Sequence, residues 1–302
     1  MQVLIAEDDA VSRCLLEATL RKLGYEVVVA RDGAAAWTIL ESDDSPRLAV
    51  LDWMMPFRDG PQLCREVRKR SDQPYTYMIL LTTRDQKQDI VEGMSAGADD
   101  YLAKPFDPRE LEVRLLAGRR ILDLHEALRV QATHDSLTGL WNRAAILDLL
   151  QRELFRAKRE GSPVGIIMGD LDHFKQINDT YGHPTGDVVL REAARRLVSA
   201  LRRYDFVGRF GGEEFLIVLP GCDLRSLATR AEALREKVCG TPVETPEGPV
   251  PIAISLGITA SEAARDQDPH LLLANADKAL YRAKSGGRNR VEAFGVQEEL
   301  QA

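Results

Sequence analysis

The sequence lacks the features that mark membrane, secreted and metal-thiolate proteins. No window approaches the roughly 18 consecutive apolar residues of a membrane-spanning helix, and the chain reaches the carboxylate of Glu7 without the basic and apolar regions of a signal peptide. The cysteines are few and have no metal-ligand spacing, which is typical of reduced thiols in the cytoplasm; they are Cys14, Cys64, Cys222 and Cys239. We therefore expect a cytoplasmic protein with no membrane partner.

An excess of basic charge is also absent. The chain has 40 Lys and Arg against 47 Asp and Glu, a net charge of −7, which argues against a general nucleic-acid partner. Residues 1–118 contain 15 basic and 21 acidic residues, and the remainder contains 25 and 26. The acidic excess therefore belongs to the first part, whereas the second part has enough Arg and Lys to bind an anionic substrate.

The length of 302 residues predicts about two domains. In the first, short apolar runs alternate with stretches of helical spacing; the runs are residues 3–6, 26–30, 48–51, 78–82 and 100–103. Five such repeats predict a parallel five-stranded sheet with helices on both faces. Ligands of such sheets bind at the carboxyl ends of the strands.

Polar residues follow these strands at their predicted ends. Carboxylates cluster there and would repel one another unless a cation joined them, which indicates Mg²⁺; they are Glu7, Asp8 and Asp52. Asp52 has the position of a nucleophile toward a phosphoryl group, and Thr82 and Lys104 could hold the transferred oxygens.

Three segments, residues 3–9, 51–56 and 97–106, resemble the receiver domain of bacterial response regulators, over residues 1–120. The resemblance implies a flavodoxin-like fold in which Asp52 accepts phosphate from a cognate histidine kinase. It implies that Glu7, Asp8 and Asp52 bind Mg²⁺ (or Mn²⁺). It also implies a switch formed by Thr82, Tyr101 and Lys104.

Residues 121–133 predict a helical connector that continues the last receiver helix. Its apolar residues are spaced four, three and four apart, which predicts one apolar stripe; they are Ala117, Ile121, Leu124 and Leu128. The stripe would pack against its own domain or form a short parallel coiled coil.

The second domain carries a hairpin tip in which two glycines precede two carboxylates. Gly211 and Gly212 supply the freedom of a tight turn and an open approach for a ligand, and Glu213 and Glu214 are hard oxygen ligands suited to Mg²⁺. Asp170, at the end of a predicted strand over Val164–Leu171, would join them if the two strands are neighbours. The sequence of this domain also predicts helices over about residues 224–238 and 269–284 and a last strand over residues 289–293.

Other polar residues of this domain suit a nucleotide. Lys175, Lys284 and Arg288 could neutralise a triphosphate. Asn178 and Asp187 offer an amide and a carboxylate, and a carboxylate matches the two N–H donors of guanine. Taken alone, Lys175 and Arg288 are more simply explained as solvated side chains, and Asp187 as a helix cap.

Four motifs, residues 135–143, 170–187, 209–215 and 276–289, resemble the GGDEF domain of diguanylate cyclases. The resemblance covers residues 134–296, with 297–302 as a tail. It implies an α+β fold of the adenylyl-cyclase and polymerase-palm type, GTP as substrate, and condensation of two GTP to cyclic di-GMP and two pyrophosphates.

The resemblance also implies roles for individual residues. Asp170, the backbone carbonyl of Leu171 and Glu213 would bind Mg²⁺, and Glu214 would be a further ligand or the general base. The remaining roles are guanine recognition by Asn178 and Asp187, phosphate binding by Lys175, Lys284 and Arg288, and close nucleotide approach at Gly211 and Gly212. Arg202 and Asp205 fit an Arg-x-x-Asp site at which the product inhibits.

The two halves together predict a phosphorylation-activated homodimer, because each catalytic domain would bind one GTP. A catalytically silent cyclic di-GMP receptor that uses only Arg202 and Asp205 is the alternative. ATP in place of GTP and a transcription factor are weaker alternatives, since Asp187 opposes the first and the second would need a further DNA-binding module.

Overall fold

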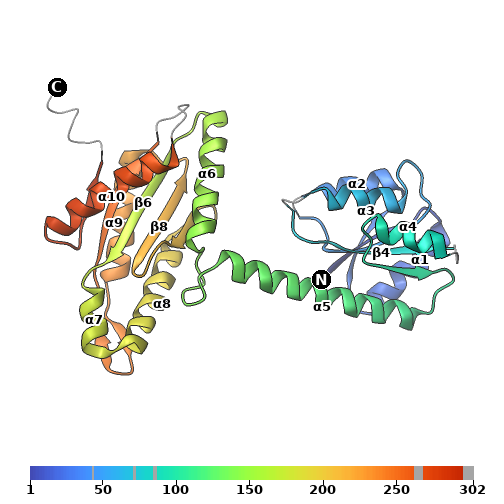
Figure 1. Cartoon of the computed structure of the whole chain (residues 1–302), viewed down its shortest axis with the longest axis horizontal. Helices are drawn as coiled ribbons and strands as arrows, with labels where there is room; N and C mark the ends of the chain where they lie inside the picture. Colours follow the sequence, from blue (N-terminus) through green and yellow to red (C-terminus); the bar gives the residue numbers. More distant parts are fainter. Residues whose placement is uncertain (43, 71–72, 84–86, 262–267, 295–302) are drawn as a thin grey trace. The chain divides into compact units, whose positions relative to one another are not determined.

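The chain forms two compact units, residues 1–129 and 130–302. The computed structural model describes all residues except 43, 71–72, 84–86, 262–267 and 295–302 (Figure 1). The predicted tail, residues 297–302, and the end of the second predicted domain lie outside the described residues. No helix within the described ranges is both long and apolar enough to cross a bilayer.

The first unit contains one parallel sheet of five strands in the order β2-β1-β3-β4-β5. Its strands are β1 (Gln2–Ala6), β2 (Glu26–Ala30), β3 (Leu48–Asp52), β4 (Tyr77–Thr82) and β5 (Asp100–Ala103). Its helices are α1 (Ala10–Lys22), α2 (Gly33–Glu41), α3 (Gly60–Arg68), α4 (Lys87–Ser95) and α5 (Pro108–Thr133), which continues beyond the unit. The predicted flavodoxin-like architecture is confirmed.

Local sequence explains why these helices begin where they do. Asp9, Asp32 and Asp59 are the N-caps of α1, α2 and α3, and each side chain accepts a hydrogen bond from a backbone N–H of the first turn. The strands bury both faces. Val3 and Ile5 belong to one core cluster and Leu4 and Ala6 to another, as expected for a parallel sheet covered on both sides.

The second unit contains a mixed five-stranded sheet in the order β12-β11-β6-β8-β7. Its strands are β6 (Val164–Leu171), β7 (Phe206–Arg209), β8 (Glu214–Pro220), β11 (Ile254–Ala260) and β12 (Val291–Ala293). Its helices are α6 (Arg143–Glu160), α7 (Phe174–Tyr181), α8 (His183–Ala200), α9 (Leu224–Cys239) and α10 (Pro269–Ser285). Helices α8 and α9 cover one face, and α6 and α10 cover the other.

Sequence-based expectations differ from this unit in two places. A separate hairpin, β9 (Val243–Thr245) and β10 (Gly248–Val250), was not predicted, because strands of three residues carry almost no periodic signal. The last strand begins at Val291 and not at residue 289, because Arg288 and Asn289 have positive φ angles of 63° and 46°. That left-handed turn cannot belong to a strand.

Candidate functional site

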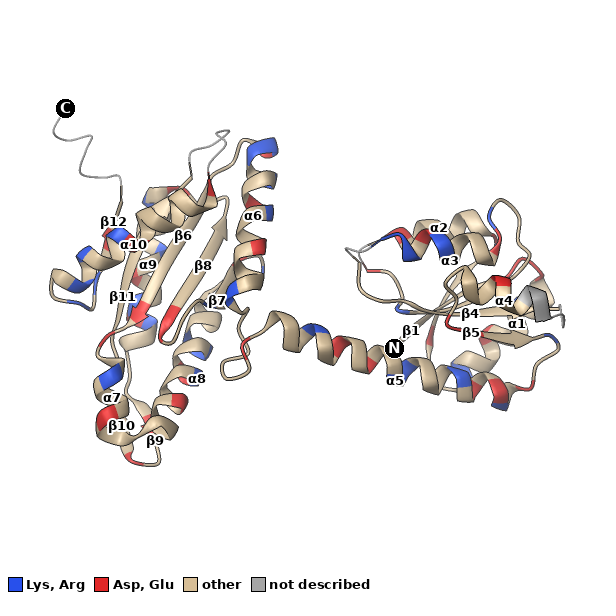
Figure 2. Cartoon of the chain, in the orientation of Figure 1, with Lys and Arg blue, Asp and Glu red and all other residues tan. Residues whose placement is uncertain are grey.

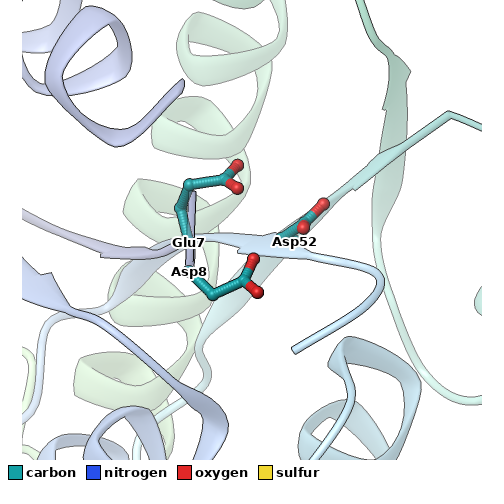
Figure 3. A group of neighbouring side chains, drawn as sticks. All are labelled: Glu7, Asp8 and Asp52. Carbon is teal, nitrogen blue, oxygen red and sulfur yellow. The ribbon is translucent and has the colours of Figure 1, made fainter. Parts of the chain in front are cut away.

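The carboxyl edge of the parallel sheet gathers the acidic residues of the first unit. One ligand oxygen from each of Glu7, Asp8 and Asp52 lies within 4.8 Å of the others (Figure 3). Glu7 and Asp8 directly follow β1 and Asp52 ends β3, and these strands are neighbours. Asp9, next along the chain, caps α1 instead. A hard cation such as Mg²⁺ suits this set of oxygen donors.

Lys104 is the cation that faces these carboxylates. Its Nζ atom lies 2.6 Å from Glu7 Oε2 and 2.7 Å from Asp52 Oδ1. Burial raises the pKa of Glu7 and of Asp52, and Lys104 opposes both shifts. Burial would lower the pKa of Lys104, but the hydrogen bonds to Asp52 and Glu7 outweigh it and raise that pKa. The lysine therefore stays charged beside the candidate phosphoacceptor.

The two remaining predicted switch residues lie on adjacent strands. Thr82 is buried at the end of β4, and its carbonyl accepts a hydrogen bond of 2.7 Å from the backbone N–H of Lys104. Tyr101 lies half-buried on β5, and the guanidinium carbon of Arg114 lies 5.6 Å from its ring centroid.

In the second unit, strand pairing brings the predicted metal residues together. Antiparallel pairing of β6 with β8 places Asp170 opposite Glu214, so acidic side chains lie side by side at the ends of these strands (Figure 2). Leu171 pairs through its N–H with the carbonyl of Glu213 at 3.3 Å. The turn is tight, because the N–H groups of Phe210 and Gly211 both approach the Glu214 carbonyl.

Asp170 is buried and its pKa reflects the charges around it. Burial raises the pKa of Asp170, Lys284 opposes the shift, and the charges of Glu213 and Glu214 add to it. Lys284 Nζ lies 2.8 Å from Asp170 Oδ2, so α10 supplies a cation to the end of β6. These carboxylates are more widely spread than Glu7, Asp8 and Asp52, which form the only such group within 4.8 Å in the described parts of the chain.

Asn178, one of the two predicted guanine-reading residues, lies against Gly186, which directly precedes the other, Asp187. A Cβ on Gly186 would lie 1.9 Å from Asn178 Oδ1, so the bare glycine lets the amide of α7 lie against the first turn of α8. Asp187 is the next residue. Lys175 and Arg288 are exposed, and among the described residues neither has an ion-pair partner. They remain available to an anion.

Asp172 positions the loop that carries Arg288. Its buried carboxylate accepts hydrogen bonds from the Ser255 hydroxyl at 2.7 Å and from the backbone N–H of Asn289 at 2.9 Å. The second bond fixes the left-handed turn that follows α10. Asp172 thus contributes to the arrangement of the loop that follows α10.

Sequence reasoning missed the contact that supports the hairpin tip. Arg209 donates from Nε and from a terminal nitrogen to the Gly212 carbonyl at 3.0 and 2.8 Å, and another terminal nitrogen lies 3.2 Å from both Asp135 oxygens. Burial would raise the pKa of Asp135, but hydrogen bonds from Thr138 and the charge of Arg209 lower it. Asp135 is the first residue of the motif over residues 135–143, and its contact with Arg209, 74 residues away, gives it a role.

Replacing Asp135 with asparagine is expected to lower nucleotide turnover by about tenfold, because Arg209 would lose its anionic partner and hold Gly212 less firmly. The Michaelis constant and the melting temperature should change little. The exposed substitution Asp148→Asn on α6 is the matched control. Equal turnover in Asp135→Asn and wild type would show that this contact does not position the hairpin.

Sequence reasoning also missed a partner of the Arg-x-x-Asp segment. Asp205 accepts a hydrogen bond from the Arg202 backbone N–H at 2.7 Å and forms an ion pair with Arg230 of α9. The Arg202 guanidinium donates to the Tyr204 hydroxyl at 2.8 Å. Arg230 lies 25 residues from Asp205, so no local sequence pattern identifies it as the partner of that carboxylate.

The fold and these sites define a two-part protein, a receiver-type parallel-sheet unit followed by a mixed-sheet unit that gathers carboxylates at one strand end. The chain belongs to the GGDEF family: residues 132–290 match the family model described as diguanylate cyclase, GGDEF domain, and residues 3–116 match the response regulator receiver domain.

Individual relatives agree with this assignment. The response regulator PleD of Caulobacter vibrioides is 35% identical over 243 residues, which are 77% of this chain and 53% of PleD. Diguanylate cyclase DgcP of Pseudomonas aeruginosa is 42% identical over 55% of this chain and 25% of its own length. This chain thus spans about half of PleD and a quarter of DgcP. The solved coiled coil and GGDEF domain of DgcB from Caulobacter crescentus, in complex with c-di-GMP, is 34% identical and covers 61% of this chain and 98% of that structure, with a TM-score of 0.55.

Proposed function

We propose that this protein is a response-regulator diguanylate cyclase that condenses two GTP into cyclic di-GMP and two pyrophosphates. The observation that carries the proposal is the pairing of Asp170 with Glu214, with Glu213 adjacent and Lys284 bound to Asp170. Three carboxylates and the Leu171 carbonyl are the donor set of a hard divalent cation. When bound, Mg²⁺ or Mn²⁺ would polarise phosphate oxygens and neutralise developing charge.

The side chains of this domain then divide the remaining work. Lys175 and Arg288 approach the phosphates as exposed cations, and Lys284 can turn from Asp170 to a phosphate when a metal takes its place. Asn178 and Asp187 read guanine. Gly211 and Gly212 leave the hairpin tip bare beside the nucleotide. Glu214 acts as a further ligand or as the base that removes the 3′-hydroxyl proton.

One such site binds one GTP, so two domains must face each other to form the product. The apolar stripe of α5 supports a homodimer. Leu124 and Leu128 are 63% and 62% exposed, so they do not pack against their own unit. An exposed stripe at this spacing favours the parallel coiled coil over the alternative that the sequence left open.

Phosphorylation of Asp52 by a histidine kinase is proposed to favour this dimer. The phosphate mimic beryllofluoride is expected to raise the cyclase rate and the dimer fraction at least about fivefold, measured by product formation and light scattering. Asp52→Asn should remove the response, and the exposed substitution Asp107→Asn should retain it. If beryllofluoride left both quantities of the wild-type protein unchanged, the coupling would be wrong.

Product inhibition is proposed at Arg202 and Asp205. Arginine can bind a guanine edge or a phosphate, and aspartate can accept from guanine. Arg230 belongs to the same cluster, since it is the ion-pair partner of Asp205. A guanine N–H edge of the product would then replace Arg230 as the partner of Asp205.

The deciding experiment is incubation of the purified protein with Mg²⁺ and either GTP or ATP, followed by identification of the products. We expect cyclic di-GMP from GTP and no cyclic dinucleotide from ATP. No product from GTP, with cyclic di-GMP bound by the same protein, would instead identify a silent receptor.

A further inference from the structure

An open cavity of about 360 Å³ lies at the amino edge of the receiver sheet, and nothing in the proposed function uses it. Arg47 directly precedes β3 and Thr76 directly precedes β4, whereas Asp52 and Thr82 end the same strands at the opposite edge. All lining residues lie within the first unit; those used below are Arg47, Arg68, Arg70, Tyr75, His125 and Arg129. We call this space the arginine cavity.

Four guanidinium groups line the arginine cavity, and two of them are neutralised. Arg68 lies 2.7 Å from Asp99, and Arg129 lies 2.7 Å from Glu126. Arg47 and Arg70 are different, because within the described ranges they donate only to main-chain carbonyls. Arg47 Nε donates to the Tyr75 carbonyl at 2.8 Å, and the terminal nitrogens of Arg70 donate to carbonyls at the end of α2, each at 3.2 Å.

Among the described residues, no carboxylate forms an ion pair with Arg47 or Arg70. Two positive charges therefore face one cavity with no counter-charge at contact distance from the described part of the chain. Burial lowers the pKa of Arg47, the charge of Glu126 opposes this shift, and the charge of Arg129 adds to it. The charged guanidinium of Arg47 is therefore less stable here than in water. A bound anion would stabilise the charged form.

Aromatic rings give the cavity a fixed wall. The rings of Tyr75 and His125 are stacked with centroids 4.1 Å apart and planes 5° from parallel, and the Arg68 guanidinium lies 4.5 Å from the Tyr75 centroid. Tyr75 belongs to the loop before β4, whereas His125 and Arg129 belong to α5. The wall is therefore built where the connector helix meets the sheet.

We propose that the arginine cavity binds a small molecule that carries a phosphate group, with Arg47 and Arg70 as its principal ligands. Guanidinium forks match the oxygen geometry of phosphate, and unlike lysine they keep their charge when partly buried. The volume is at the lower end of small-molecule sites, which suits a sugar phosphate better than a dinucleotide. Such a ligand would tie α5 to the loops that precede β3 and β4.

The proposal is tested on the full chain by titration calorimetry with inorganic phosphate and with ribose 5-phosphate. We expect at least one of these probes to bind, and each of Arg47→Gln and Arg70→Gln to weaken that binding at least about tenfold. The probe that binds more tightly distinguishes a free-phosphate site from a phosphate-ester site. Arg109→Gln, an exposed arginine outside the cavity, should bind as wild type does.

Hydrogen exchange supplies a readout that does not depend on the variants. The bound probe should slow exchange of the amides around His125 and Arg129 in wild type, and the effect should vanish in Arg47→Gln. Melting temperatures near wild type verify that both variants fold. Absence of binding by either probe, or equal binding by wild type and Arg47→Gln, would overturn the proposal.

Discussion

Replacing Asp170 with asparagine is expected to lower cyclic di-GMP synthesis at least about 100-fold. The substitution keeps the shape of the side chain and removes the one carboxylate that β6 contributes to the predicted metal site. Glu213 and Glu214 come from the facing hairpin and cannot supply it. The concentration of Mg²⁺ that gives half-maximal rate should also rise by about tenfold.

The loss of activity should occur without loss of stability. Burial of the Asp170 carboxylate raises its pKa, Lys284 opposes the shift, and the charges of Glu213 and Glu214 add to it. Because the pKa is raised overall, folding disfavours the charged form, and the charge of Asp170 does not stabilise the fold. The Lys284 side chain is 35% exposed, so water can solvate its ammonium group once the partner is gone. We expect a melting temperature equal to or above that of wild type.

The matched control is Asp277→Asn, an exposed carboxylate on α10 outside the site. It should leave rate, metal dependence and stability unchanged. If Asp170→Asn kept more than a tenth of the wild-type rate at saturating Mg²⁺, Asp170 would not be a ligand of the catalytic metal.

Replacing Gly257 with alanine is expected to destabilise the second unit by about 3 kcal/mol. A Cβ at this position of β11 would lie 2.1 Å from the Leu280 nitrogen and 2.2 Å from the Ala276 carbonyl oxygen. Both atoms belong to the backbone of α10, so no side-chain rotation can relieve the overlap. The helix must move away from the sheet.

This displacement should also reduce activity in the folded protein, because α10 carries Lys284 and leads to the turn of Arg288. The melting temperature should fall by roughly 6–12 °C, measured by calorimetry. Gly212→Ala is the control for stability, since no heavy atom lies within 4 Å of its added Cβ and its φ is not positive. Equal stability of Gly257→Ala and wild type would mean that α10 does not approach the sheet this closely.

The sequence predicted the elements whose signals are local. The bounds of β2 and β6 agree with the predicted strands, because each is a short, mainly apolar segment that follows a turn. The first residues of α9 and α10 agree as well, since Asp223 and Asp268 cap them. The β9–β10 hairpin was not predicted, and the predicted start of β12 was wrong. Neither segment has a periodic pattern long enough to detect.

The same limit applied to the candidate sites. Motif residues such as Asp52, Asp170 and Glu214 could be named from the sequence, because their chemistry is visible in a few neighbouring residues. The contacts of Arg209 with Asp135 and of Arg230 with Asp205 could not be predicted. Each joins residues far apart in the chain, and a surface arginine has no local signal that identifies its partner.

The sequence by itself determined the two fold classes, the family and the identity of the polar residues at the strand ends. Only the tertiary structure decided which of these residues meet. The register of β6 against β8 places Asp170 opposite Glu214, and the approach of α10 to β11 at Gly257 brings Lys284 to Asp170. The arginine cavity likewise exists only because loops before β3 and β4 meet α5. Composition and spacing show which reactive side chains the chain has and where they lie along it. Strand register and helix packing depend instead on burial of apolar residues that are far apart in the sequence, so no short segment determines them.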